Sequence, residues 1–175
     1  AQLSARAGGA SDALLVAVVV RTRDGERVFR SPTARDRETL RVARTTLAEL
    51  EAGDLAGLLP DEPLPPAGTL GFRVQRYGVL RWREMFSPRQ ALALATLAKL
   101  VRDYRLDDHE PEFGRAVRAC LALVVDRVCD YLNSFCSWNP SSASLPHLFT
   151  RQALPIIWDF AEGNPLGSAA GSWEA

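Results

Sequence analysis

The sequence is poor in several residue types that carry specialised chemistry. Lys99 is its single lysine, and its three cysteines lack the close spacing of zinc ligands. The longest apolar run, residues 13–20, is far shorter than the ~20 residues that a membrane span needs. No glycine-rich phosphate loop is present. The sequence therefore predicts no metal ligands, no cofactor site and no membrane partner in this segment.

The cysteines also indicate a cellular compartment. Cys120, Cys129 and Cys136 fall in one predicted helix, where Cys129 and Cys136 would lie about 10 Å apart along the axis, too far for a disulfide. We therefore expect reduced thiols that pack as small apolar groups, and a cytoplasmic protein.

Apolar residues make up 47% of the chain, enough for a substantial core. The patterning predicts a mainly α fold with a small β portion (α+β), in which an N-terminal β-hairpin precedes about four helices around a long central helix. We expect a hairpin segment over residues 1–33, a helical domain over 34–165 with an irregular strand region at 69–86, and a flexible tail over 166–175. Both ends look cut, which suggests a fragment of a longer protein.

Local signals place the first elements. Residues 13–22 and 27–30 are rich in β-branched and other strand-forming side chains, and the intervening Asp24-Gly25 is typical of a hairpin turn. Thr33 can cap a helix over residues 34–52. The sequence thus predicts a hairpin that leads directly into a helix.

Later elements follow from prolines and caps. Residues 54–68 are rich in proline and predict an extended connector laid over the core. Ser87 caps a helix from Pro88 to about Tyr104. A last helix is predicted over residues 148–162, kinked at Pro155.

The long central helix is predicted over residues 112–136. Its apolar arc is wider than a surface helix needs, so we expect other elements to pack on it from two sides. Asp126, Asp130 and Asn133 line up on the polar side. They form either a solvated face or a row of acceptors that faces a cleft.

Further polar groups could belong to such a cleft. His147 and Arg151 come just before and inside the predicted last helix, and we include both with the three acceptors as possible cleft-facing groups. A nucleophilic pair of Cys136 and His147 is conceivable, but the sequence indicates no third group to orient it. A helix cap or loop anchor is the alternative role for His147.

The densest chemical signal lies between Phe72 and Arg89, where arginines alternate with aromatic residues. Basic and acidic residues number 21 each, so net charge alone selects no partner. Guanidinium groups can hold phosphates while aromatic faces stack on unpaired bases. The alternative is an amphipathic strand pair with its aromatics in the core and its arginines in water. The DNA-contact candidates are Arg73, Arg76, Tyr77, Arg81, Trp82, Arg83 and Arg89.

Several stretches resemble one family of large bacterial and archaeal proteins, the adenine-specific DNA methyltransferases. These are GTLGFRVQRYGVLRWREMFSPRQALALATLAKLV at 68–101, YLNSFCSW at 131–138 and HLFTRQALPIIWDFAEGNPLG at 147–167, which occur there in this order. The opening AQLSARAGGASDALLVAVV is similar to the segment that follows the family's zinc ribbon. The resemblance covers nearly the whole chain.

The resemblance implies transfer of a methyl group from S-adenosylmethionine to adenine in DNA by a parent enzyme. The family's cofactor loop, zinc-ribbon cysteines and Asp-Pro-Pro-Tyr motif have no counterpart here, so no catalytic residue carries over. The chain would be an accessory insert that contacts DNA or braces the catalytic halves and zinc ribbon of the same protein, in a restriction or phage-defence context. The alternatives are a helical protein-interaction scaffold without DNA contact, or an independent small enzyme.

Overall fold

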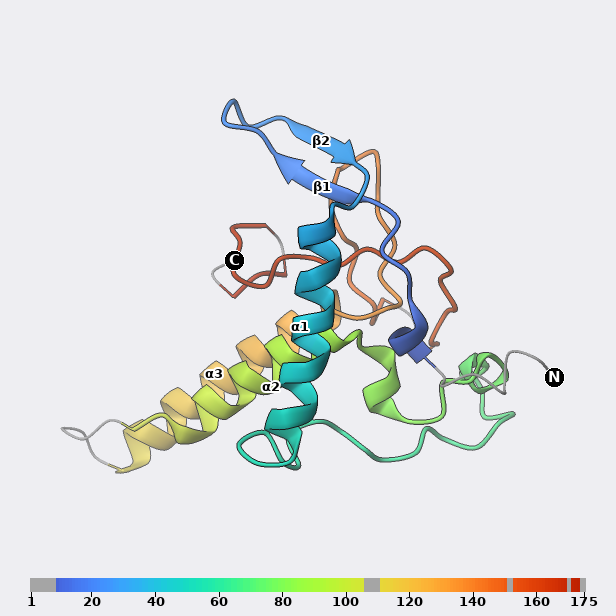
Figure 1. The fold of residues 1–175 in the computed structure, drawn as a ribbon. Coiled ribbons are helices and arrows are strands. Elements are labelled where there is room, and N and C mark those ends of the chain that lie inside the picture. The colour runs from blue at the N-terminus through green and yellow to red at the C-terminus, as the bar shows by residue number, and fades with distance from the viewer. Residues whose placement is uncertain (1–8, 106–110, 151–152, 170, 174–175) are drawn as a thin grey trace.

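The computed structural model describes residues 9–105, 111–150, 153–169 and 171–173. Its regular elements are the strands β1 (Val18–Arg21) and β2 (Arg27–Arg30) and the helices α1 (Ala34–Glu51), α2 (Pro88–Asp103) and α3 (Pro111–Tyr131). Three single-turn 3-10 helices are η2 (Gly9–Asp12), η3 (Val74–Tyr77) and η4 (Trp82–Met85). The predicted α+β class is confirmed (Figure 1).

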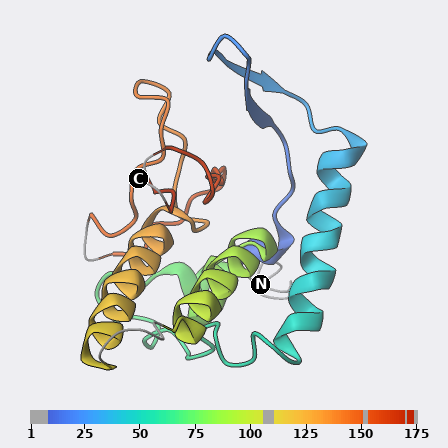
Figure 2. The same ribbon diagram turned by 90° about the vertical axis from the view of Figure 1, so that its left-hand side faces the viewer.

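The three helices lie side by side, with α2 between α1 and α3 and in contact with both (Figure 2). The buried residues of α2 are Gln90, Ala91, Leu94, Ala95, Leu97 and Val101. In α3 only Val128 is fully buried among the described residues. Among the three helices the central one is therefore α2, whereas α3, which the sequence predicted as the centre, packs on α2 and, at its C-terminal end, on residues 147–149.

The predicted starts of α1 and α2 are confirmed. Thr33 Oγ1 accepts the Asp36 N–H, and Asp36 Oδ2 in turn accepts the Thr33 N–H at 2.7 Å, which forms a capping box. Ser87 and Gln90 form the same reciprocal pair at α2, with Pro88 in its first turn. These local bonds explain why both helices begin where the sequence alone places them.

The hairpin is confirmed, although β1 is shorter than the predicted strand at 13–22. Val18 pairs with Arg30 and Arg21 with Arg27 in an antiparallel register. Gly25 has a φ of 85°, a left-handed conformation that glycine adopts at little cost, and its N–H donates to Thr22 O. The Asp24-Gly25 turn that the sequence predicted thus joins the two paired strands.

The connector after α1 lies over the core through Leu55, Leu59 and Leu64, as expected. The irregular strand region predicted at residues 69–86 is wrong, because these residues form η3 and η4, with isolated bridges at Phe72 and Arg81. Gly78, with a φ of 87°, ends η3, and the Glu84 carboxylate accepts the Leu80 and Arg81 N–H groups at η4. Left-handed glycines and a carboxylate cap favour turns over a ladder.

The expected last helix is also wrong. Residues 148–150 and 153–162 are irregular, and α3 ends at Tyr131 rather than continuing to residue 136. Leu154 bridges Phe72, and the Ala161 N–H donates to Cys136 O at 2.8 Å. Pro155 cannot donate a helical hydrogen bond, so this stretch takes its partners from distant segments. We call residues 132–150, 153–169 and 171–173 the C-terminal irregular region.

The sequence predicted a flexible tail over residues 166–175, but residues 171–173 pack against the rest of the chain. Ser172 is buried, Trp173 packs against the core, and a side chain at Gly171 would collide with the ring of Tyr131. At the other end, a side chain at Gly9 would collide with Glu84. Two glycines therefore allow both ends of the described chain to approach its middle closely. No helix in the described ranges combines the length and apolar character needed to cross a bilayer.

Candidate functional site: an apolar cavity and an exposed aromatic pair

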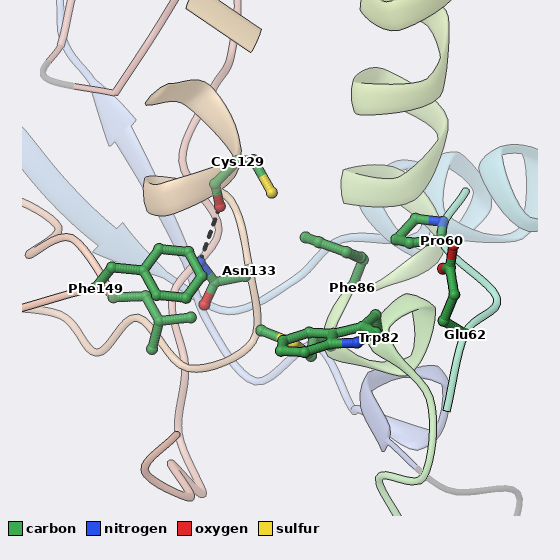
Figure 3. A pocket seen from close by; sticks show the side chains of 9 residues that line it. Pro60, Glu62, Trp82, Phe86, Cys129, Asn133 and Phe149 are labelled. Carbon is green, nitrogen blue, oxygen red and sulfur yellow. Dashed lines mark hydrogen bonds between the residues drawn. The ribbon is translucent and has the colours of Figure 1, made fainter. Parts of the chain in front are cut away.

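A cavity of about 360 Å³ opens where the connector, η4, the end of α3 and residues 148–149 meet (Figure 3). Trp82 and Asn133, which the sequence assigned to two separate candidate groups, both line it. Glu62 is its one ionisable carboxylate. The full lining is Pro60, Glu62, Trp82, Met85, Phe86, Cys129, Asn133, Leu148 and Phe149. The cavity is thus mainly apolar, with a single acidic group in its lining.

Asp130 holds one wall of the cavity. Its Oδ1 accepts the Phe149 N–H at 2.8 Å, its Oδ2 lies 3.2 Å from His147 Nδ1, and its carbonyl accepts the Leu148 N–H at 3.0 Å. The His147 ring also packs against Tyr131, with centroids 5.6 Å apart and the two planes inclined by 34°. Asp130 therefore positions a loop, which supports the loop-anchor role for His147.

The predicted row of acceptors is divided by the fold. Asp126 is exposed, as expected of a solvated face, whereas Asn133 is only 1% exposed. Asn133 donates to Cys129 O and Asp130 O at 3.0 Å each and accepts the Phe135 N–H. Its hydrogen bonds are used to end α3. Arg151, the remaining cleft candidate, lies outside the described residues.

The thiols near the cavity are poor nucleophiles. Burial raises the pKa of Cys129, which lines the cavity, to about 11, and neighbouring carboxylates add to the effect. Burial likewise raises the pKa of Cys136 to about 11. Cys136 Sγ contacts the Asp130 carbonyl and the Asn133 amide oxygen, while His147 binds the Asp130 carboxylate. The described contacts thus do not assemble a cysteine–histidine pair.

Three of the predicted DNA-contact arginines are occupied by acids of the same chain. Arg81 pairs with Asp61 at 3.2 Å, and Arg89 pairs with Glu162 at 2.6 Å. Arg83 bridges Glu51 and Asp61. Trp82 is half-buried and meets Phe72 edge to face. For these residues the structure favours a role in holding the connector, η4 and the C-terminal irregular region together.

The other candidates form an exposed group with one residue that the sequence analysis did not assign to DNA. Arg73, Arg76 and Tyr77 are exposed on and beside η3. The Leu154–Gly71 hydrogen bond brings residues 153–158 alongside, and Tyr77 meets Trp158 edge to face with centroids 5.7 Å apart. Trp158 is 74% exposed. We call Arg73, Arg76, Tyr77 and Trp158 the aromatic platform.

Within the described residues no ion pair or side-chain hydrogen bond involves Arg73 or Arg76, so both guanidinium groups remain available. Trp158 was not assigned to DNA because residues 148–162 were expected to form a helix, where it would lie on an apolar face. Pro155 is the sequence signal that could have placed it in an irregular segment. The described part of the chain also shows no cluster of three or more histidine, cysteine or carboxylate side chains arranged to bind a metal ion.

Comparison of the chain with known protein-family models, with curated proteins and with solved structures gives no match. The functional argument therefore rests on the residues of this chain, on their geometry, and on the sequence resemblance described above.

Proposed function

We propose that this chain is an accessory, DNA-contacting unit of an S-adenosylmethionine-dependent adenine-specific DNA methyltransferase, and that it is not catalytic alone. The observation that carries the DNA contact is the aromatic platform, which combines two exposed rings with two exposed arginines that have no ion-pair partner among the described residues. The resemblance of three sequence blocks supplies the methyltransferase context.

The platform has the two components of a single-strand contact. Tyr77 and Trp158 offer ring faces, and stacking on an aromatic side chain is worth about 1–3 kcal/mol for each base. Arg73 and Arg76 add positive charge that attracts the phosphates on either side. A methyltransferase must move its target base out of the stack, which leaves unpaired nucleotides for such a surface to hold.

The cavity offers little to the carboxylate of the methyl donor. That carboxylate needs hydrogen-bond donors, whereas the lining is mainly apolar and its one ionisable carboxylate is Glu62. The Asn133 amide already donates to two backbone carbonyls. We therefore place cofactor binding in the catalytic halves of the parent enzyme, outside this segment.

The test is fluorescence anisotropy with short single-stranded DNA across a salt series. We expect Arg73→Ala with Arg76→Ala to weaken binding and to lower the slope of log affinity against log salt by about 1.4, because each lost phosphate contact contributes about 0.7. We expect Trp158→Ala to weaken binding by about 1–3 kcal/mol with little change in that slope.

The matched control removes two exposed arginines elsewhere, Arg102 at the end of α2 and Arg115 on α3, by substitution with alanine. It changes the net charge equally but leaves the platform intact. Equal losses in the control and in the platform variants would refute the proposal, as would the absence of binding at low salt.

A second candidate function, a helical protein-interaction scaffold, is favoured by an apolar stripe along α3. Phe113 and Leu123 are 54% and 67% exposed, and Ala116 and Cys120 lie between them on the same side at helical spacing. This candidate predicts self-association that Leu123→Glu abolishes in sedimentation velocity. Leu166→Glu, at a residue that is 75% exposed, serves as the control. An unchanged sedimentation coefficient for Leu123→Glu would contradict self-association through α3.

A further inference from the structure

The hairpin stands away from the helical body, beyond the N-terminal end of α1 (Figures 1 and 2). It is a two-stranded sheet, and its residues Val19 and Phe29 are 41% and 59% exposed. A hairpin of this kind gains little stability by itself, since it buries few apolar residues. The core of the fold does not need a projecting arm, which raises the question of what the arm contacts.

The outer part of the hairpin carries three arginines, Arg21, Arg23 and Arg27, against two acids, Asp24 and Glu26, so its net charge is positive. Register places Arg21 directly opposite Arg27, and like charges in such a pair destabilise an antiparallel ladder. Arg23 lies in the turn between them, and all three arginines are exposed. No ion pair between described residues involves any of the three, although Arg21 Nε donates to Gly25 O at 3.3 Å. An anionic partner would relieve this repulsion.

The base of the hairpin is fixed to the body. Arg30 makes two hydrogen bonds to the Asp36 carboxylate, at 2.6 and 3.0 Å, which join β2 to the first turn of α1. These bonds lower the pKa of Asp36 well below its usual range, because they stabilise the charged carboxylate. Phe29 meets Trp138 edge to face, with centroids 5.9 Å apart. Contacts at the base therefore orient the hairpin, and Arg21, Arg23 and Arg27 lie at its outer end.

One face of the ribbon combines charge with apolar surface. Side chains alternate between the two faces of a strand, so Val19 and Arg21 share a face with their partners Phe29 and Arg27. At the base of this face Phe29 meets Trp138, yet 59% of Phe29 remains exposed. The major groove of duplex DNA admits a two-stranded β-ribbon, its walls carry phosphates for arginine, and thymine methyl groups offer apolar contacts. An acidic protein surface would match the charge but would not supply a groove of this width.

We propose that the β1–β2 hairpin is a second DNA contact, a basic ribbon that enters the groove of duplex DNA. The inference rests on the proposed function for its choice of DNA, but it uses different residues and a different form of the nucleic acid. The aromatic platform would hold unpaired nucleotides while the hairpin holds the duplex beside them.

The test replaces Arg21, Arg23 and Arg27 by glutamine and measures anisotropy with a short duplex and with one of its strands. We expect the affinity for the duplex to fall by roughly ten-fold or more, and the salt slope to fall by about 2.7, because each phosphate contact on duplex DNA contributes about 0.9. We expect single-strand binding to stay within about two-fold, since the platform is intact.

The control replaces Arg41, Arg102 and Arg115, which pair with acids on their own helices, by glutamine. A duplex affinity equal to that of this control would overturn the inference, as would equally effective competition by polyglutamate, which offers charge without a groove. The triple variant could lose its hairpin, so a single variant, Arg23→Gln, provides a second test, because Arg23 lies in the turn outside both strands. This variant must lower the salt slope by about 0.9.

The two proposals can fail separately. If the hairpin variant binds duplex like its control while Arg73→Ala with Arg76→Ala loses single-strand binding, the hairpin inference is wrong and the proposed function stands. If both variants match their controls, both proposals fail.

Discussion

The helical part of the molecule and the C-terminal irregular region achieve order by different means. The helices α1 and α2 begin at side chains that bond within three residues, such as Thr33 with Asp36. The irregular region is held by bonds between distant segments, such as Leu154 to Gly71 and Ala161 to Cys136. Both the cavity and the aromatic platform lie where the irregular region meets the segment between α1 and α2, which contains η3 and η4. Local side-chain bonds therefore set where helices begin, whereas bonds between distant segments position the candidate sites.

The largest expected effect is in the helical part. Leu94 of α2 is 6% exposed in the core, so Leu94→Ala should lower the free energy of unfolding by about 3 kcal/mol through lost burial and the cavity that it leaves. Leu100 on the same helix is 62% exposed, and Leu100→Ala should change stability by no more than about 0.5 kcal/mol. Urea unfolding followed by circular dichroism measures both, and similar losses would show that α2 is not the central helix.

A smaller effect is expected at the junction of the two parts. Asn133→Ala would leave the buried Phe135 N–H without its partner and should cost about 2 kcal/mol. Hydrogen exchange should accelerate after Tyr131 more than in α1. Asn139→Ala, at an exposed turn where the side chain accepts the Ser141 N–H, is the control. Uniform acceleration along the whole chain would mean that the irregular region has no separate stability.

The smallest effect concerns thiol reactivity. Cys129 and Cys136 have pKa values raised to about 11, so at neutral pH they are almost wholly protonated. Alkylation followed by mass spectrometry should label the exposed Cys120 first. Labelling of Cys129 and Cys136 should rise about tenfold for each pH unit until the pH approaches their pKa, because the thiolate reacts.

Thiol labelling also tests whether the irregular region unfolds before the helices. Cys136 lies in the irregular region, so we expect it to react at lower urea than the concentration that unfolds the helices. Simultaneous labelling of Cys136 and loss of helix would indicate a single cooperative unit.

Sequence reasoning succeeded where a feature depends on neighbours in the chain. Thr33 and Ser87 cap helices as predicted, and the Asp24-Gly25 turn sets the hairpin. It failed for residues 148–162, whose apolar spacing resembles a helix. There Pro155 removes a donor, and bonds to Gly71 and Cys136 replace the helical ones. Such partners cannot be identified from local pattern alone.

The candidate site shows the same limit. The sequence identified Arg73, Arg76 and Tyr77, but it could not separate them from arginines that meet acids far along the chain. Arg89 meets Glu162, which is 73 residues away, and Arg83 meets Glu51, which is 32 residues away. Long-range ion pairs leave no periodic signal, so only the fold shows which charges remain available for a partner.

The close approaches of Gly9 to Glu84 and of Gly171 to Tyr131 have a consequence for the order of folding. Helices form from contacts between near neighbours, whereas each glycine contact must first close a long loop. We therefore expect α1, α2 and α3 to assemble early and the two ends to join last. An assembly intermediate of this chain would have its helices in place and the rings of Tyr131 and Trp173 still in water.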